Sequence, residues 1–356
     1  MPHINVPLTH NSYDVVIAKN ILSSTGNEAA KLISPGRCTI VTDSNVGPLH
    51  AETLMSSLRA ASFDPILITV PAGENSKSLA QAEAIGDQMI NAKLDRHSSL
   101  FALGGGVIGD LAGFVASIFY RGIPFVQIPT TLLAQADSSI GGKTSVNSSL
   151  GKNLLGTFYQ PSLVITDPAL LSTLPKKTFY DGFAEMIKHA IIADREMLKL
   201  LPMDQNEDLS NLIAHNVAIK ASIVAEDERE ISGRRALLNF GHTIGHAIEA
   251  AGNYEIFSHG EAIALGTVAA LDLSVQHAGL PEEEKEKIIT ILKSCGFLIR
   301  IPQKFSLNKI LEALARDKKF QQGAIRFVLT PRLGEAFVSS DITLQEISKA
   351  SRRLIA

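Results

Sequence analysis

The chain has 356 residues, 45% of them hydrophobic, and a formal net charge of −3 at pH 7. This length exceeds what one hydrophobic core usually supports, so we expect two domains. The charge balance shows no basic excess, which argues against a protein that binds nucleic acid or a membrane surface. The sequence has no long apolar run and no signal-peptide pattern, so the expected location is the cytoplasm.

The first half of the chain alternates strand-like and helix-like segments. Short apolar, β-branched runs are typical of buried strands, and the segments between them have helical periodicity. This alternation predicts an α/β layer with a mostly parallel sheet. The expected strands lie at residues 13–17, 38–42, 66–70, 99–103 and 122–129, with one more strand and a turn within 163–175, and the expected helices include 47–60 and 78–92.

A glycine run follows the strand expected at residues 99–103. Residues 104–110 read GGGVIGD. A strand that ends in glycines before a helix lets backbone N–H groups approach a pyrophosphate at the helix N-terminus. The run does not follow the first strand, where the usual fingerprint lies, so a dinucleotide site and a plain tight turn both remain open. Asp43, just after an earlier strand, is either a nucleotide contact or a cap.

A segment rich in glycine, serine and asparagine lies at residues 138–156, and we expect a flexible loop there. Its two charged side chains are Lys143 and Lys152, which lie near Asn147 and Asn153. Two ammonium groups on such a loop suit a phosphate or another anionic substrate group. The alternative is a solvated surface loop.

Helical periodicity dominates after Pro175, so we place the domain boundary there, with domains at residues 1–175 and 176–356. Pro281, followed by three glutamates, is typical of a helix start. The expected helices lie at residues 179–193, 208–230, 235–251, 260–278, 281–295 and 307–315, and residues 325–329 and 335–338 are candidates for a small hairpin.

Histidines are concentrated in the second half of the chain. His242 and His246 are four residues apart, so both rings project from one face of a helix, and His259 follows. Imidazole and carboxylate together are typical ligands of a Zn²⁺-type ion, and three protein ligands leave a position open for a substrate oxygen. Thr243 occupies the glutamate position of the H-E-x-x-H motif, so peptidase chemistry is not indicated. Each histidine alone could instead be a hydrogen-bonded core or surface residue.

A second short run, GFAEMIKHA at residues 182–190, is a candidate contributor to the same site. In a helix its Glu185, Lys188 and His189 share one face. Glu185 is therefore a candidate carboxylate ligand beside the histidines.

Seven motifs together resemble those of the 3-dehydroquinate synthases, which are sugar phosphate cyclases related to glycerol dehydrogenase-like enzymes. The resemblance spans roughly residues 40–320. It implies an N-terminal Rossmann-like α/β domain at 1–175 that binds NAD, an all-α C-terminal domain at 176–356 that binds metal and substrate, and a homodimer. The motifs are GGGVIGDLAGFVAS, RGIPFVQIPTTLLAQADSSIGGKT, LGKNLLGTFYQP, GFAEMIKH, EDERE, RALLNFGHTIGHAIE and SHGEA.

The resemblance also implies a reaction. The family converts 3-deoxy-D-arabino-heptulosonate 7-phosphate to 3-dehydroquinate and phosphate in the shikimate pathway, and is thus a carbon–oxygen lyase. The steps are transient oxidation by NAD, β-elimination of phosphate, re-reduction, ring opening and intramolecular aldol closure. The implied cofactors are NAD and one Zn²⁺ or Co²⁺ ion per subunit.

Site residues carry over position by position. The implied metal ligands are Glu185, His242 and His259. The implied NAD contacts are Asp43, Asn45, Glu74, Lys77, Gly105, Gly106, Val107, Asp110, Thr130, Thr131, Asp137, Lys152 and Thr173. The groups implied around the substrate are Lys143, Asn153, Lys188, His246, Lys319 and Arg121, with Lys220, Arg235 and Asn239 at its carboxylate.

In the family, the residue that Arg121 matches reaches the active site of the partner subunit. The chain departs from the family pattern at Ser145, where glycine is usual, and at Ser148 and Ser149, where His-Pro is more common. These departures concern the placement of the substrate loop.

Three other interpretations of the sequence remain open. A metal- and NAD-dependent polyol dehydrogenase would share the fold and metal placement but would have no need of Lys220, Arg235 and Lys319, because a polyol carries neither carboxylate nor phosphate. A silent dinucleotide-binding subunit would not need the metal ligands. A related cyclase whose substrate lacks the carboxylate is disfavoured by the set Lys220, Arg235 and His246.

Overall fold

A computed structural model of the chain describes residues 3–303, 305–316 and 326–355. The chain divides into two compact units, the first formed by Met1–Pro175 with Gln205–Ala225, and the second by Lys176–Asp204 with Glu226–Ala356. The segment Gln205–Ala225 therefore belongs with the first unit, although the sequence analysis places it in the second domain. Its Lys220 contacts Asp137, which explains this assignment.

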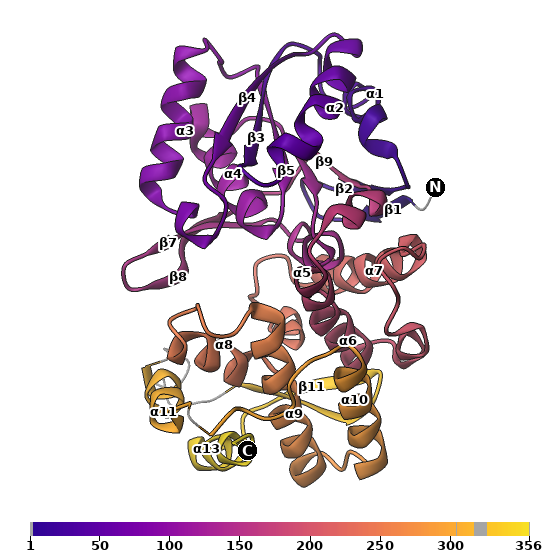
Figure 1. Cartoon of the computed structure of the whole chain (residues 1–356), viewed down its shortest axis with the longest axis vertical. Coiled ribbons are helices and arrows are strands. Elements are labelled where there is room, and N and C mark those ends of the chain that lie inside the picture. Colours follow the sequence, from indigo (N-terminus) through magenta and orange to yellow (C-terminus); the bar gives the residue numbers. More distant parts are fainter. Residues whose placement is uncertain (1–2, 304, 317–325, 356) are drawn as a thin grey trace. The chain divides into compact units, whose positions relative to one another are not determined.

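A seven-stranded sheet forms the centre of the first unit (Figure 1). All neighbouring strands are parallel except the first pair, as the sequence predicts for an α/β layer. The first strand was not predicted, because HINV is short and mostly exposed. In spatial order the strands are β1 (His3–Val6), β2 (Tyr13–Ile17), β9 (Leu163–Thr166), β6 (Phe125–Pro129), β5 (Ser99–Gly104), β3 (Arg37–Asp43) and β4 (Asp64–Val70).

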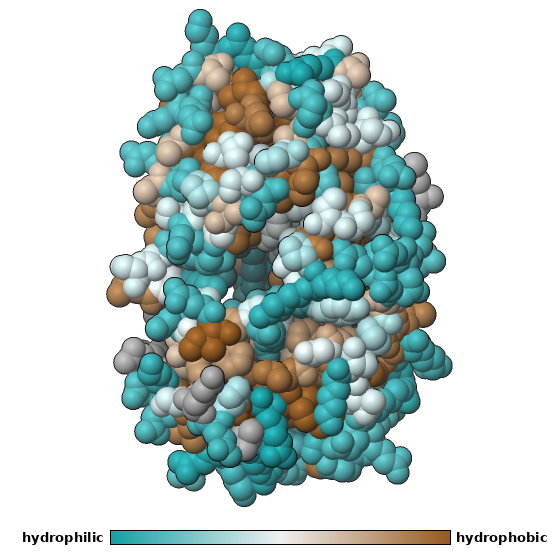
Figure 2. All heavy atoms as spheres, viewed as in Figure 1, coloured by the Kyte–Doolittle hydropathy of each residue, from teal (hydrophilic) through white to brown (hydrophobic). Residues whose placement is uncertain are grey.

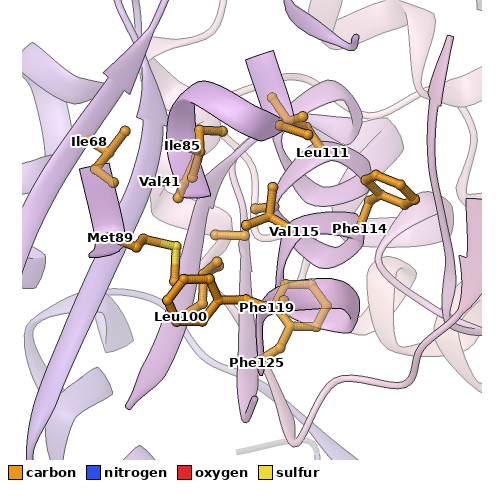
Figure 3. Close-up of a cluster of buried hydrophobic side chains, with 14 of the residues drawn as sticks. Val41, Ile68, Ile85, Met89, Leu100, Leu111, Phe114, Val115, Phe119 and Phe125 are labelled. Atoms are coloured by element: carbon orange, nitrogen blue, oxygen red, sulfur yellow. The ribbon is translucent and has the colours of Figure 1, made fainter. Parts of the chain in front are cut away.

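Helices cover both faces of this sheet. Successive residues of a strand point to opposite faces. Accordingly, Leu100 of β5 packs in a cluster with residues of α3 (Leu79–Asn91) and α4 (Gly106–Ile118) (Figure 3), and the next residue, Phe101, packs with residues of α2 (Gly47–Ala60). The strands inside the sheet are largely buried on both faces and are nearly continuous apolar runs, as is typical of parallel sheets, whereas the edge strands β1 and β4 are partly exposed. The helices of this unit are α1 (Thr25–Ala30), α2 (Gly47–Ala60), α3 (Leu79–Asn91), α4 (Gly106–Ile118) and α7 (Ser210–Glu226).

Short helical turns complete the connections of the first unit. Ala134–Ser138 is a single π-helical turn, a form that is rare and often found at functional sites. The remaining turns are 3₁₀ helices at Ile21–Ser24, Glu74–Ser76, Phe119–Arg121 and Pro168–Thr173.

Residues 143–158 form an antiparallel hairpin of β7 (Lys143–Ser148) and β8 (Gly151–Phe158). The expectation of a flexible loop is therefore wrong. Thr144 lies opposite Thr157, and their hydroxyl oxygens are 2.9 Å apart. Val146 is buried in the cluster formed with α3 and α4. Cross-strand pairs and one buried β-branched side chain fix a strand where composition alone indicates a loop.

In its described residues, the second unit consists mainly of helices with one small hairpin, which agrees with the predicted helical C-terminal half. Its helices are α5 (Lys176–Asp181), α6 (Phe183–Ile192), α8 (His242–Ala251), α9 (His259–His277), α10 (Glu282–Ser294), α11 (Leu307–Arg316) and α13 (Leu344–Arg353), with 3₁₀ helices at Arg195–Leu200 and Arg234–Asn239. The hairpin pairs β10 (Phe327–Arg332) with β11 (Glu335–Ser339).

Three helices of the second half differ from the prediction. The helix expected at 179–193 is divided between α5 and α6. The helix expected at 235–251 is broken at Gly241, which has a φ of +76°. A Cβ atom there would lie 2.7 Å from Oγ1 of Thr267, so only glycine fits this turn. The helix expected at 208–230 ends at Glu226.

On the face drawn in Figure 2, hydrophilic residues cover most of the surface, with smaller hydrophobic patches between them. Among the described residues, no helix is both long enough and apolar enough to pass through a membrane.

Candidate metal and nucleotide sites

The strand order of the first unit reverses next to β3. From β3 the chain passes through α2 to β4 on one side, and then through α3 to β5 on the other side of β3. Ligands of open parallel sheets bind outside the carboxyl ends of the strands at such a reversal. Asp43 ends β3, Gly104 ends β5 and Gly105 is the N-cap of α4. These three residues therefore lie where the fold favours a nucleotide.

The glycine run allows α4 to begin directly at the end of β5. A Cβ atom at Gly104 would lie 2.6 Å from Cβ of Ile108, and one at Gly105 would lie 3.0 Å from Cγ2 of Thr131. Without these side chains, the first N–H groups of α4 are close to the strand end, where a helix N-terminus binds anions.

Four polar side chains of the first unit form one cluster around Lys77. The buried Lys77 donates to Oδ2 of Asp110 and to Oδ1 of Asn153. The hydroxyl of Ser145 lies 3.1 Å from Oδ1 of Asn153 and 3.5 Å from Oδ2 of Asp110. Burial raises the pKa of Asp110, although Lys77 opposes this effect. Two implied nucleotide contacts and one implied substrate contact are thus brought together.

A second group links Glu74 to the hairpin. Asn147 donates from Nδ2 to Oε1 of Glu74 at 2.8 Å, and Nζ of Lys152 lies 3.9 Å from the same oxygen. Oδ1 of Asn147 accepts the N–H of Asn153 at 3.0 Å. Asn147 therefore links the implied contacts Glu74 and Asn153, and Glu74 in turn pairs with Lys152.

Asp43 and Thr173, two other predicted nucleotide residues, have protein partners of their own. Oδ1 of Asp43 accepts the N–H groups of Asn45 and Val46 at 2.8 and 3.0 Å, as a cap does. Oγ1 of Thr173 lies 3.1 Å from Nε2 of His50. Elsewhere in this unit, Gly106 and Val107 lie in the first turn of α4, Thr130 and Thr131 follow β6, and Lys143 begins β7.

Lys220 lies in the first unit, whereas Arg235 and Asn239 lie in the second. Nζ of Lys220 donates to the carbonyl oxygen of Asp137 at 2.7 Å and lies 3.0 Å from its Oδ1. This pair joins an implied carboxylate-binding residue to an implied nucleotide contact. The common role of Lys220, Arg235 and Asn239 stays a prediction.

In the second unit, Glu185, His242 and His259 offer three ligand atoms that all lie within 4.8 Å of one another. Nε2 of His242 and Nε2 of His259 lie 3.2 and 3.1 Å from Oε1 of Glu185. Glu185 comes from α6, His242 begins α8 and His259 begins α9. The side chain of Glu185 is only 1% exposed. A buried carboxylate and two imidazoles at this spacing fit a divalent cation.

The other ring nitrogen of each histidine has a protein partner. Nδ1 of His242 lies 3.1 Å from the carbonyl oxygen of Phe240, and Nδ1 of His259 lies 3.4 Å from Oε2 of Glu249. Such partners fix the tautomer of a ligating histidine and direct its remaining nitrogen. Both Nε2 atoms are therefore directed towards Glu185.

The charges around the three residues act on ligation in opposite directions: an ionised carboxylate favours it, and a protonated imidazole opposes it. Burial alone would raise the pKa of Glu185, but Lys188 and His242 hold it well below its usual value. Burial would lower the pKa of His259, but hydrogen bonds to Glu185 and Glu249 raise it to about 10. The carboxylate is thus ionised, and a cation that binds His259 displaces a proton.

Two implied substrate residues lie beside this group. Lys188 is one helical turn after Glu185 and forms an ion pair with it. The ring centroid of His246 lies 5.1 Å from that of His242 and 6.3 Å from that of His259, and His246 is exposed. The predicted common face of α6 and the predicted common face of α8 are thus both observed.

A tight turn presents Arg235. Nη1 of Arg235 donates to the carbonyl oxygen of Glu228 at 2.6 Å, and its Nε lies 3.9 Å from Oε1 of Glu230. Asp227 organises the turn, because its carboxylate accepts the backbone N–H groups of Ile231, Ser232, Gly233 and Arg235. Asn239 ends the 3₁₀ helix that Arg234 begins.

The turn that carries the predicted Arg121 has an unusual backbone conformation. Arg121 has a φ of +71°, and the preceding Tyr120 has a φ of +47°. Non-glycine residues in this region are strained, and such strain occurs preferentially at functional sites. Lys319 lies outside the described residues.

Two residues that organise these sites, Glu249 and Asp227, were not predicted from the sequence. Glu249 lies seven residues after His242, on the same face of α8, so helical spacing could have indicated it. Asp227 accepts the N–H groups of the residues that follow it, as aspartates commonly do in turns, but in EDERE it resembles a charged helix end.

Comparison with known families gives a consistent result. The family model described as 3-dehydroquinate synthase N-terminal matches residues 67–181, and the one described as 3-dehydroquinate synthase C-terminal matches residues 182–320. The 3-dehydroquinate synthase of Methylacidiphilum infernorum is 43% identical over 357 residues, covering 99% of this chain and 98% of the relative.

Two solved structures are similar over nearly the whole chain. The first is a 2-epi-5-epi-valiolone synthase from Streptomyces hygroscopicus with NAD⁺ and Zn²⁺ bound; it is 29% identical, has a TM-score of 0.88 and covers 98% of each chain. The second is a 2-deoxy-scyllo-inosose synthase complexed with carbaglucose-6-phosphate, NAD⁺ and Co²⁺. It is 24% identical, has a TM-score of 0.89, and the match covers 99% of this chain and 100% of that one. These two structures share the fold of the chain, and the two family models together with the 43% identical relative show that the chain belongs to the 3-dehydroquinate synthase family.

Proposed function

We propose that the protein converts 3-deoxy-D-arabino-heptulosonate 7-phosphate to 3-dehydroquinate and phosphate. The observation that carries this proposal is the 43% identity, over nearly the full length of both chains, to a relative named 3-dehydroquinate synthase. The reaction is the family's sequence of oxidation, phosphate elimination, re-reduction, ring opening and aldol closure.

A divalent cation, Zn²⁺ or Co²⁺, is held by Glu185, His242 and His259 in this proposal. The observed spacing of the three ligand atoms, the buried carboxylate and the two oriented imidazoles support it. NAD binds at the carboxyl ends of β3 and β5. When bound, the cation would polarise the substrate hydroxyl that is oxidised, and NAD would accept and return the hydride.

The chain's own residues bind and orient the substrate. Arg235 supplies a planar fork of donors that matches a carboxylate, and the turn organised by Asp227 holds its guanidinium in place. Lys188 and His246 lie beside the proposed metal ligands, where negative charge gathers on the substrate. Lys143 and Asn153 serve the phosphate end. Lys319 stays a prediction for the same end.

We further propose a homodimer in which Arg121 reaches the active site of the partner subunit. The strained backbone of Arg121 and Tyr120 supports a functional role of this turn. Ile118 and Tyr120 are 52% and 47% exposed, and exposed apolar side chains beside Arg121 suit burial against a second copy. A cytoplasmic location stays a prediction from the sequence.

The proposal is tested by following phosphate release from the heptulosonate phosphate with purified protein. Release should require NAD⁺, should stop when a chelator removes the metal, and should yield 3-dehydroquinate. A matched substrate, a heptulose 7-phosphate without the carboxylate, tests for a related cyclase. Faster turnover of that substrate would assign the protein to a different cyclase activity, and net NADH formation from a polyol would assign it to the dehydrogenases.

A further inference from the structure

His259 lies between two carboxylates, one on each side of its ring. Its Nε2 is 3.1 Å from Oε1 of Glu185, and its Nδ1 is 3.4 Å from Oε2 of Glu249. A neutral imidazole carries one N–H, and the nitrogen without the proton binds a metal. The carboxylate that accepts the proton therefore decides which nitrogen faces a cation.

Glu249 is well placed for this role. It is 6% exposed and lies on α8, seven residues after His242 and therefore on the same helical face. The backbone of His259 is fixed independently, because Ser258 and Glu261 form a capping box at the start of α9. The orientation and the tautomer of the ring must be fixed by a contact of the ring itself. Among the described contacts of Nδ1, the hydrogen bond to Glu249 is the one that can do this.

A competing arrangement exists, because His246, Glu249 and His259 also offer three ligand atoms within 4.8 Å. In that arrangement Glu249 would itself be a ligand. The first set is favoured because Nε2 of both His242 and His259 lies near one oxygen of the nearly fully buried Glu185. His246, in contrast, is exposed.

We propose that Glu249 is a positioning residue that accepts the Nδ1 proton of His259 and so directs Nε2 to a divalent cation bound by Glu185 and His242. This inference rests on the metal site of the proposed function. Carboxylate partners of this kind typically change metal affinity by about 10- to 100-fold when they are removed.

The test measures Zn²⁺ affinity of the full-length, metal-stripped protein by competition with a chromophoric chelator. Glu249→Ala should weaken Zn²⁺ binding by about 10- to 100-fold. Glu249→Gln loses the charge but keeps an oxygen that can accept the proton, so it should restore most of the affinity. Glu255→Gln, on the exposed turn after α8, is the matched control and should bind Zn²⁺ as the unchanged protein does. Thermal melting of each metal-free variant reports whether it is folded.

Each outcome decides between the alternatives. Equal losses in Glu249→Ala and Glu249→Gln would mean that the charge matters and not the hydrogen bond, which overturns the inference. A loss in His246→Ala together with unchanged binding in Glu185→Gln would make Glu249 a ligand and also overturn it. If Glu185→Gln weakens binding but Glu249→Ala does not, the metal site stands and the positioning role fails. If the unchanged protein binds neither Zn²⁺ nor Co²⁺, the metal site of the proposed function is contradicted.

Discussion

Arg235 and Arg234 are neighbours in sequence but differ in their surroundings. The side chain of Arg235 is 2% exposed, whereas that of Arg234 is 48% exposed and pairs with Glu226. Arg235→Lys keeps the charge but loses the two-pronged geometry for a carboxylate, so kcat/KM should fall by roughly 5- to 150-fold, or about 1–3 kcal/mol. Steady-state kinetics on the heptulosonate phosphate measure this. Arg234→Lys is the control, and equal kinetics in both variants would exclude the assigned role.

His259 and His277 stand at opposite ends of α9, and only His259 contacts the proposed ligand group. His259→Ala should abolish both tightly bound metal and phosphate release, since a ligand is removed. Metal content by elemental analysis, together with the activity assay, measures this. His277→Ala should leave both unchanged. A His259→Ala protein that retains its metal would show that the ligand set is misassigned.

Asp227 is expected to give a pH-dependent contribution to stability. Despite its burial, backbone hydrogen bonds lower its pKa from 3.8 to about 2. Between these values the unfolded chain binds the proton more readily, so the stabilisation is complete above about pH 4 and is lost as the pH falls through about 2. Asp227→Asn should therefore lower the melting temperature at pH 7, with a difference from the unchanged protein that shrinks below pH 4. Asp341→Asn, an exposed control, should show no such trend.

At the level of single residues, periodicity identifies neighbouring side chains only within one helix, and the ligand set that joins α6, α8 and α9 was predicted from the family resemblance. The spacing of His242 and His246 and the pair Glu185 and Lys188 were accessible because helical periodicity places them on one face. The contact between Glu249 and His259 could not be predicted from the sequence, because it depends on the conformation of the turn between α8 and α9. Local periodicity does not specify that turn.

Helix α4 packs closely against its neighbours through Gly113. A Cβ atom there would lie 2.5 Å from Cγ2 of Thr144 and 3.0 Å from Cζ of Phe125. Gly113→Ala should therefore destabilise the protein by about 1–3 kcal/mol, measured by urea unfolding. Gly86 on α3 has no neighbouring atom within 4 Å of such a Cβ, so Gly86→Ala should be neutral or stabilising by up to about 1 kcal/mol. Equal effects of the two changes would contradict this packing.

At the level of elements, the buried strands were predictable from the sequence, and the hairpin of β7 and β8 was not. The inner parallel strands are nearly continuous apolar runs, and such runs can be recognised in the sequence without knowledge of the tertiary structure. β7 and β8 read as a loop because serine, asparagine and glycine dominate them, yet Val146 and the pair of Thr144 with Thr157 fix their register. Ser145 adds a hydroxyl to the cluster around Lys77, at a position where the family usually has glycine.

At the level of the whole molecule, the proposed exchange of Arg121 between subunits can be tested by mixing. Arg121→Ala and His259→Ala proteins should each be nearly inactive. After joint unfolding and refolding, about half of the dimers should be mixed, and each mixed dimer has one site with both residues intact. About a quarter of the normal activity should therefore return. No recovery, with dimers confirmed by sedimentation, would show that Arg121 serves its own subunit.

The chain passes between its two compact units three times, after Pro175, Asp204 and Ala225. As the protein is synthesised, all seven strands of the sheet leave the ribosome early, but α7 follows only after residues 176–204 of the other unit have emerged. The hydrogen bond from Lys220 to Asp137 can form only after that point. Chaperones that act on the nascent chain would therefore bind a chain in which all strands of the sheet have emerged, but α7 and most of the second unit have not.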